Sequence, residues 1–255
     1  MLEITDIHAA YKHIPVFSSL SLFLSQKRRA AIIGRSGSGK STLLKICAGL
    51  KPTVKGSVFF KGKPVLPGNP GIGIVLQDHG LFPWMTIREN LELGLRFRKM
   101  NQVQIQDTVQ KAFSRFKITS IADQYPGKIS GGEKQRAAIV RTLVTKPELV
   151  LLDEPLSSLD ALTRDELSFF LLDTMRQGEH SVILVTHSIE EAVLIGEDIY
   201  ALTPNASKPL HLLGENKRYW DKDYRETAEF HSMVKRIRNT FYKMDTKGAP
   251  GEQRV

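Results

Sequence analysis

The stretch Gly34-Arg35-Ser36-Gly37-Ser38-Gly39-Lys40-Ser41 decides the fold of this chain. Two glycines enclose four positions and are followed by lysine and serine, which is the phosphate-loop pattern. Glycines let the backbone wrap around a phosphate with its N–H groups pointing inward, and the next helix presents the positive end of its dipole. Lys40 would supply charge to the β- and γ-phosphates, and the Ser41 hydroxyl would coordinate Mg²⁺. The residues predicted to bind the nucleotide here are Gly34, Arg35, Ser36, Gly37, Ser38, Gly39, Lys40, Ser41 and Thr42.

The segments on either side of this loop supply the context that the pattern requires. The apolar run Ala30-Ala31-Ile32-Ile33 predicts a buried strand that ends at the loop. After it, residues 41–50 place apolar side chains at helical spacing, with Gly49 and Pro52 as stop signals. A strand, a glycine-rich turn and a helix in this order predict an α/β nucleotide-binding core.

Two adjacent carboxylates follow a second buried strand. The sequence Leu149-Val150-Leu151-Leu152 ends in Asp153 and Glu154, at the carboxyl edge of the sheet where open α/β folds bind ligands. By itself such a pair more often begins a helix, and only the phosphate loop favours a catalytic interpretation. We then expect Asp153 to hold the Mg²⁺ shell and Glu154 to orient and deprotonate the attacking water.

A third motif, Ile129-Ser130-Gly131-Gly132-Glu133-Lys134-Gln135-Arg136, resembles the signature of the ABC ATPase family, Leu-Ser-Gly-Gly-Gln. Ile129 and Glu133 depart from that signature, whereas Ser-Gly-Gly is intact. Ser130 and the amides of Gly131 and Gly132 would form a second anion site at a helix start, although an isolated Ser-Gly-Gly is more often only a helix cap. In the family this site contacts the ATP that is bound to the opposing subunit.

The resemblance extends over about residues 2–205 and implies further roles. Tyr11 matches the aromatic residue that stacks on adenine. Gln77 matches the glutamine that senses Mg²⁺ and the γ-phosphate, and Asp160, in the motif Ser157-Ser158-Leu159-Asp160, matches an aspartate that reaches across the dimer. His187, after the strand-like run of residues 181–185, matches the switch histidine that contacts the γ-phosphate. The expected catalytic residues are Glu154, His187, Gln77 and Lys40, and the expected metal ligands are Ser41, Gln77 and Asp153.

The pattern along the chain predicts an α/β fold with a P-loop NTPase core, in which helices flank a mixed sheet. Residues 1–33 alternate apolar and polar positions, and strand-like runs follow at 56–60 and 72–76. We also expect an N-terminal antiparallel β region. Helical patterns from about residue 87 to 135 predict an inserted signature subdomain. A helix over 163–177 completes a βαβ unit. We expect an ATPase domain over 1–213 and a charged C-terminal extension over 214–255, with a short helix and a frayed end at residues 247–251.

Composition limits the class of protein. The chain has 255 residues, 41% of them apolar, and no apolar run approaches the ~20 residues of a spanning helix. Its first residues lack the basic start of a signal peptide. The single cysteine, Cys47, excludes an internal disulfide and is expected to be buried. A formal net charge of +9 suggests anionic partners without choosing among them.

The resemblance also implies partners. A single cassette must pair as a homodimer, or with a similar cassette, because each ATP needs the phosphate loop of one chain and the signature of another. The segment 77–84 would contact transmembrane permease subunits, with Phe82 and Trp84 either as anchors or packed within the subdomain. Residues 81–86 and 159–164 look like the importer subgroup for nitrate, sulfonate and taurine, which implies a separate solute-binding protein and a peripheral position on the cytoplasmic face of the membrane.

A rival interpretation is an ABC-type ATPase that works on nucleic acid or in assembly, without a permease. Chromosome-type members insert long coiled coils before the signature, and only about 90 residues without heptads separate Lys40 from Ser130 here. Translation-type members carry two cassettes. We therefore expect ATP and Mg²⁺ as cofactors and no direct contact with nucleic acid.

Overall fold

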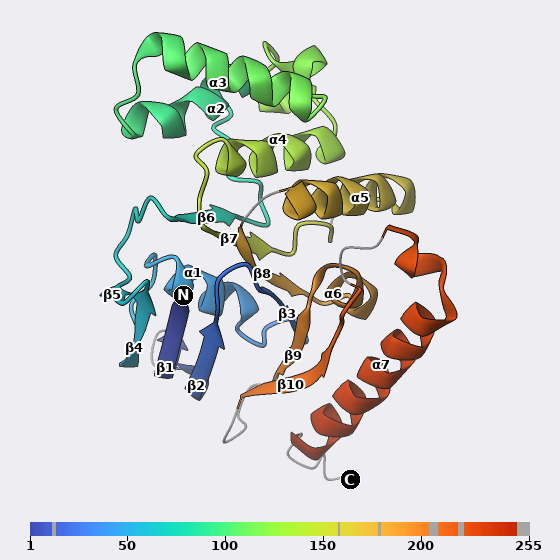
Figure 1. Ribbon diagram of the computed structural model, residues 1–255. Helices are drawn as coiled ribbons and strands as arrows, with labels where there is room; N and C mark the ends of the chain where they lie inside the picture. Colours follow the sequence, from blue (N-terminus) through green and yellow to red (C-terminus); the bar gives the residue numbers. More distant parts are fainter. Residues whose placement is uncertain (12–13, 158, 178–179, 204–208, 219–221, 249–255) are drawn as a thin grey trace.

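The computed structural model describes residues 1–11, 14–157, 159–177, 180–203, 209–218 and 222–248. Ser158 of the predicted dimer loop and residues 249–251 of the predicted frayed end lie outside this part of the chain. Figure 1 shows two sheets below, a layer of helices above them and a long helix along one side.

The central sheet has six strands in the order β10-β9-β3-β8-β7-β6. Their bounds are Arg29–Ile33 (β3), Ile72–Val75 (β6), Leu149–Asp153 (β7), Ser181–Thr186 (β8), Asp198–Leu202 (β9) and Leu210–Glu215 (β10). Neighbouring strands from β9 to β6 run parallel, and β10 pairs antiparallel with β9. The predicted mixed sheet is therefore confirmed.

Side chains of the central strands alternate between two cores. Ala31 and Ile33 of β3 belong to the core beneath α5 (Ala161–Gln177) and α6 (Ile189–Ile195). Ala30 and Ile32 belong to the core on the other face, with α1 (Lys40–Cys47). Strands covered on both faces need continuous apolar runs, which is why these runs were visible in the sequence.

A second sheet covers the α1 side. It consists of β2 (Ile14–Leu24), β1 (Leu2–Tyr11), β4 (Lys55–Phe60) and β5 (Lys63–Pro64), and its strand pairs are antiparallel. Buried side chains of β1 and β2, such as Leu2 and Phe17, share the core of α1. The predicted N-terminal antiparallel β region is present.

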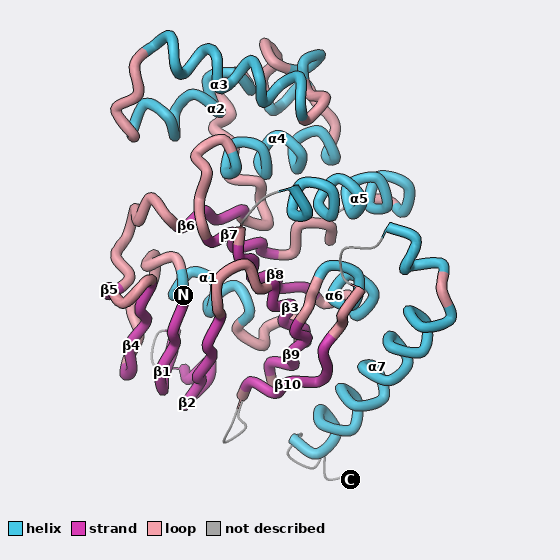
Figure 2. Tube along the Cα trace, viewed as in Figure 1, coloured by secondary structure: helices cyan, strands magenta, loops and turns pink. Residues whose placement is uncertain are grey.

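The inserted helical region packs around its own core. It contains α2 (Ile87–Phe97), α3 (Gln102–Arg115), two short 3-10 helices (Thr119–Ile121 and Pro126–Lys128) and α4 (Gly131–Leu143). Capping boxes begin α2 at Thr86 and α3 at Asn101, which fixes where each helix starts. Figure 2 shows this part of the chain as helix and loop only, above the strands.

The C-terminal segment packs against the core. A 3-10 helix (Lys222–Glu226) precedes α7 (Ala228–Gly248), whose 21 residues make it longer than the short helix expected. Tyr224, Phe230 and Ile237 are buried in the same core as α6. Strand β10 crosses the boundary proposed at residue 213. Within the described residues, no helix has both the length and the apolarity needed to span a membrane.

Candidate functional site

The parallel strands bring the predicted phosphate loop, acids and histidine to one edge of the sheet. Ile33 pairs with Thr186, so that Gly34 and His187 follow neighbouring strands. Asp153 pairs with Val185, and Val75 pairs with Leu152, which places Gln77 beyond the same edge. The topology thus assembles residues that are more than a hundred positions apart in the chain.

The loop itself is shaped by glycines. Gly37 and Gly39 have φ values of 78° and 96°, which lie in the region that glycine adopts at little cost. A Cβ on Gly34 would lie 2.5 Å from Ser38 Oγ and 2.9 Å from the carbonyl oxygen of Leu202. Ser38 Oγ is buried and has no hydrogen-bond partner among the described residues. A tight backbone turn with an unpartnered hydroxyl, at the start of α1, suits a phosphate group.

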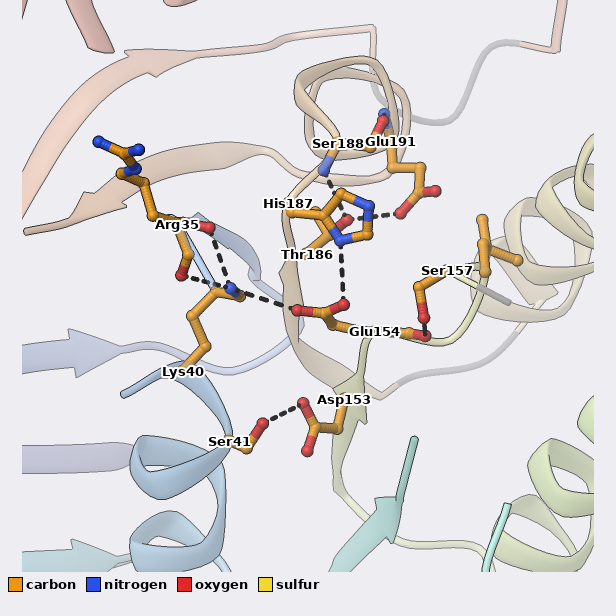
Figure 3. Close-up of polar contacts among 12 residues, drawn as sticks. Arg35, Lys40, Ser41, Asp153, Glu154, Ser157, Thr186, His187, Ser188 and Glu191 are labelled. Carbon is orange, nitrogen blue, oxygen red and sulfur yellow. Dashed lines mark hydrogen bonds and ion pairs between the residues drawn. The ribbon is translucent and has the colours of Figure 1, made fainter. Parts of the chain in front are cut away.

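Lys40 and Glu154 form the centre of the site, as Figure 3 shows. Lys40 is 4% exposed, and its Nζ donates to the carbonyl oxygens of Gly34 at 2.9 Å and Arg35 at 3.1 Å. The same Nζ lies 3.2 Å from Glu154 Oε1. The other oxygen of Glu154 lies 2.9 Å from Nδ1 of His187. A cation, a carboxylate and an imidazole are therefore in line beside the phosphate loop.

The backbone holds Glu154 in an uncommon conformation. Its φ is 45°, in the left-handed region, which costs a non-glycine residue ~1–3 kcal/mol. Two contacts fix this turn: the Glu154 N–H donates to the Val185 carbonyl at 3.0 Å, and Ser157 Oγ donates to the Glu154 carbonyl at 3.0 Å. The strained turn aims the carboxylate back at Lys40 and His187 rather than along the strand.

Ser41 and Asp153 face each other beneath this centre. Ser41 Oγ donates to Asp153 Oδ1 at 2.9 Å, and burial raises the pKa of Asp153 above its usual range. A hydroxyl and a carboxylate are hard oxygen ligands of the kind that Mg²⁺ prefers, and Mg²⁺ usually takes one or two protein ligands beside water and phosphate. These two residues therefore fit the ion. Gln77 lies beyond β6 with an exposed side chain that makes no hydrogen bond to either of them.

Sequence reasoning missed the contacts that fix the backbone on either side of His187. Thr186 Oγ1 donates to Glu191 Oε2 at 2.6 Å and accepts from the Ser188 N–H at 3.0 Å. Ser188 Oγ in turn accepts from the Glu191 N–H at 3.2 Å. Burial raises the pKa of Glu191. The spacing of Ser188 and Glu191 is that of a capping box, and this signal was available in the sequence.

The signature motif forms a second, separate group at the start of α4. Ser130 is the N-cap: its Oγ accepts from the Glu133 N–H at 3.3 Å, and Glu133 Oε2 accepts from the Ser130 N–H at 2.8 Å. Ser130 Oγ also donates to Glu133 Oε2 at 2.8 Å. The backbone hydrogen bond from Ser130 is the main cause that lowers the pKa of Glu133. The residue that departs from the family signature thus completes the cap as a carboxylate.

The glycines of this motif lie beside the segment that precedes α5. A Cβ on Gly132 would come within 2.4 Å of Thr163 Cγ2, and one on Gly131 within 3.7 Å of Leu159. Asp160 Oδ1 accepts from the Thr163 N–H at 3.1 Å and so caps α5. The structure therefore brings the signature and the predicted dimer loop together at the starts of α4 and α5.

Two predicted contacts lie at the rim. Tyr11 ends β1, is 62% exposed and has Lys51 Nζ 5.1 Å from its ring centre. Trp84 is 69% exposed, and its ring centre lies 5.5 Å from that of the half-buried Phe82. The buried Asn90 fixes this loop, because its Oδ1 accepts from the Phe82 N–H at 2.8 Å. Trp84 is thus presented to solvent, and Phe82 is partly packed.

Comparison with known proteins gives consistent matches. The family model described as ABC transporter matches residues 17–157. The taurine import ATP-binding protein of Escherichia coli O157:H7 is 34% identical over 216 residues, which is 85% of this chain and 85% of the relative. The nitrate import ATP-binding protein of Synechocystis sp. is 34% identical over 206 residues, which is 79% of this chain and 77% of the relative.

Solved structures show the same architecture. A dimeric ATP-binding cassette bound to ADP and phosphate, in a post-hydrolysis state, superposes with a TM-score of 0.71 at 28% identity and covers 79% of this chain and 94% of its own. A dimeric bacterial ABC transporter cassette gives 0.70 at 29% identity, with the same coverage.

Proposed function

The chain belongs to the ABC transporter family, and from that premise we propose that it is the ATP-binding and ATP-hydrolysing subunit that powers a membrane transporter. The observation that carries this proposal is the arrangement of Lys40, Glu154 and His187 beside the phosphate loop, with contacts of 3.2 Å and 2.9 Å to the glutamate. It offers a phosphate-binding cation and a water-activating carboxylate within one site.

Binding of the triphosphate is assigned to the loop and to Lys40. The N–H groups of residues 34–42 and the Ser38 hydroxyl would surround the β-phosphate, and the start of α1 adds its dipole. Lys40 would exchange the carbonyls of Gly34 and Arg35 for phosphate oxygens, which are stronger acceptors because they carry charge. Tyr11, at the end of β1, would stack on the adenine.

Hydrolysis is assigned to Glu154. Its carboxylate accepts a proton from the attacking water, while His187, held by Thr186 and Ser188, contacts the γ-phosphate from the neighbouring strand. The fixed left-handed turn at residue 154 positions the base before the substrate arrives, which reduces the reorganisation needed in the transition state. Ser41 and Asp153 would hold Mg²⁺, with Gln77 joining when the nucleotide is bound; the ion supplies charge neutralisation at the phosphates.

A second copy of the chain, or a similar cassette, would complete the site. The start of α4 presents Ser130, Gly131 and Gly132 beside the segment that contains Asp160, whereas Lys40 stands at the start of α1. Both structural relatives are dimeric cassettes, which supports an arrangement where the signature of one chain contacts the ATP of the other. ATP would then act as the adhesive between two copies.

Import of a small solute is the role that the relatives support. The two named relatives are import ATP-binding proteins for taurine and nitrate. We place the chain on the cytoplasmic face of the membrane, bound to permease subunits through the loop that exposes Trp84, with a separate solute-binding protein supplying an anion of the sulfonate or nitrate kind. The ATPase domain would span 1–213 with the helical subdomain at about 87–135, and residues 214–255 would form an extension, of which α7 packs against the core.

Replacing Glu154 with glutamine tests the proposal. The Glu154→Gln variant should lose turnover by roughly 10²- to 10⁴-fold, because the amide cannot accept the proton of the attacking water. ATP affinity should persist or rise, since a negative charge next to Lys40 is removed, and the ATP-loaded dimer should become stable in size-exclusion chromatography. The matched control is Glu3→Gln, an exposed site on β1. Unchanged hydrolysis in Glu154→Gln would remove the residue from its role as base.

A further inference from the structure

A cavity of about 750 Å³ lies at the end of the sheet opposite to the nucleotide site. Its wall includes Lys27, Glu148 and His180, which directly or nearly precede β3, β7 and β8. Asp153 and His187, by contrast, stand at the carboxyl ends of β7 and β8. Cavities that bind small molecules have volumes of ~300–1,000 Å³, so this one has the size of a ligand site.

The wall of the cavity comes from two parts of the molecule. The sheet side supplies the residues just named, and the helical subdomain supplies Lys111 and Arg115 of α3 together with the end of α4 at Val144. A molecule in the cavity would therefore touch the subdomain that carries Ser130 and the sheet that carries Glu154 at the same time.

Positive charge dominates this wall. Lys27, Lys111, Arg115 and Lys146 face two carboxylates, those of Asp107 and Glu148. Both carboxylates are already in ion pairs: Asp107 with Lys111 at 2.7 Å, and Glu148 with Lys61, which lies outside the cavity, at 2.8 Å. The potential in the cavity is therefore positive, and its walls are partly screened from solvent, which concentrates anions.

The floor is apolar. Ala112, Leu143 and Val144 line it and are between 6% and 7% exposed. The guanidinium of Arg115 lies 5.2 Å from the ring centre of Phe116, and both residues line the cavity. An inorganic ion would leave such a floor uncovered, whereas an organic anion would cover the floor with its apolar body and pair its charged group with the wall.

We propose that this cavity binds a small organic anion, which consists of an apolar body and a single anionic group such as a sulfonate, carboxylate or phosphate. The bound anion connects α3 and the end of α4 to the amino ends of β3, β7 and β8. The bound anion stabilises the arrangement of helical subdomain and sheet in which the cavity is present. Although it binds far from the nucleotide, it thereby changes the population of the conformations that hydrolyse ATP. Binding of the anion does not depend on the proposed transport function.

The test measures the affinity of two fluorescent probes for the full chain. Saturating ADP is present throughout and keeps the nucleotide site filled. The anionic probe is 8-anilinonaphthalene-1-sulfonate, and its neutral counterpart is N-phenyl-1-naphthylamine, which has the same rings without the sulfonate. We expect one saturable site for the anion. Lys146→Gln and Arg115→Gln should each weaken it by about tenfold, which is the effect expected of one charge-assisted contact, and should change binding of the neutral probe less than twofold.

Two further variants separate the cavity from general adsorption. Ala112→Phe fills the floor and should abolish binding of both probes, whereas Lys63→Gln, an exposed cation on β5 outside the cavity, should change neither. Circular dichroism checks that each variant is folded. The proposal is overturned if the anion binds equally well to Lys146→Gln and Arg115→Gln, or if Ala112→Phe retains the site, or if both probes bind with the same affinity. None of these outcomes bears on Glu154→Gln, so that the two proposals fail independently.

Discussion

Truncating Ile237 to alanine is expected to destabilise the whole chain, although the residue lies in the segment assigned to an extension. Ile237 is fully buried, and a Cβ added to Gly214 of β10 would lie 3.2 Å from its Cδ1. The change removes three carbon groups, worth ~0.8 kcal/mol each in transfer free energy. A residual cavity of ~70 Å³ adds ~1.7 kcal/mol at ~24 cal/mol per Å³. The expected loss in free energy of unfolding is therefore about 4 kcal/mol.

Thermal unfolding measures this loss. For a chain of this size 1 kcal/mol corresponds to ~2–4 °C in Tm, so Ile237→Ala should lower Tm by about 8–16 °C. Two thermal transitions should move to lower temperature together: the loss of helix content, followed by circular dichroism, and the release of a fluorescent ADP analogue. They are coupled because α7 shares its core with α6 and the central strands. The control is Leu212→Ala on β10, where the side chain is 52% exposed and the expected cost is under ~1 kcal/mol. A Tm within 2 °C of the unmodified chain, or loss of helix signal without release of nucleotide, would refute the packing argument.

Two further predictions concern buried titratable groups. Burial raises the pKa of the Glu191 carboxyl, so the folded chain binds a proton there at a higher pH than the unfolded chain does. The contribution of Glu191 to the free energy of unfolding is therefore present below about pH 4.5 and is lost as pH rises through the raised pKa. Glu191→Gln should therefore gain stability relative to the unmodified chain as pH rises above about 4.5 in urea titrations, and a difference that does not change with pH would contradict the assignment. Burial also raises the pKa of the Cys47 thiol to about 12, so a disulfide reagent at pH 8 should modify it only after denaturation. Prompt reaction of the native chain would show that the thiol is accessible.

The phosphate loop, the acids after β7 and the inserted helices were predictable because their signals are local. Each follows from a short motif or from a period that a few neighbouring residues display. The strands β9 and β10 were not predicted. β9 has five residues and begins with the charged Asp198, so its apolar run is short, and its strand identity depends on pairing with β3, far away in sequence. Non-local pairing of this kind leaves little trace in the residues of the strand itself.

The packing of α7 illustrates a different reason for missing a feature. Phe230, Val234, Ile237 and Phe241 recur at helical spacing and are all buried, so the signal was present. The segment was nevertheless interpreted as a charged extension, because basic residues lie between these apolar positions. The sequence does not show which surface these four side chains cover. In the structure they pack on an apolar face that α6 and β10 form together.

The roles of single residues depended on contacts that no motif contains. The sequence indicated Glu154 and His187 as neighbours of ATP, but the ion pair with Lys40 and the strained turn at residue 154 appear only when β7 and β8 are aligned. Glu133 is a different case, because Ser130 and Glu133 have the spacing of a capping box and that contact was readable in the sequence. For Glu154 the residue type was readable, and its partners were not.

Two of the elements that reach the cavity, β7 and α4, also lead to residues that the proposed function uses. Strand β7 begins one residue after Glu148 at the cavity and ends at Asp153, followed directly by Glu154. Helix α4 is capped by Ser130 at one end and reaches the cavity through Leu143 at the other. Both elements are packed in the interior, and a close-packed interior has low compressibility and transmits strain. In the proposed dimer, a ligand that fixes their far ends would therefore restrict how Glu154 of one copy and Ser130 of the other approach the same ATP.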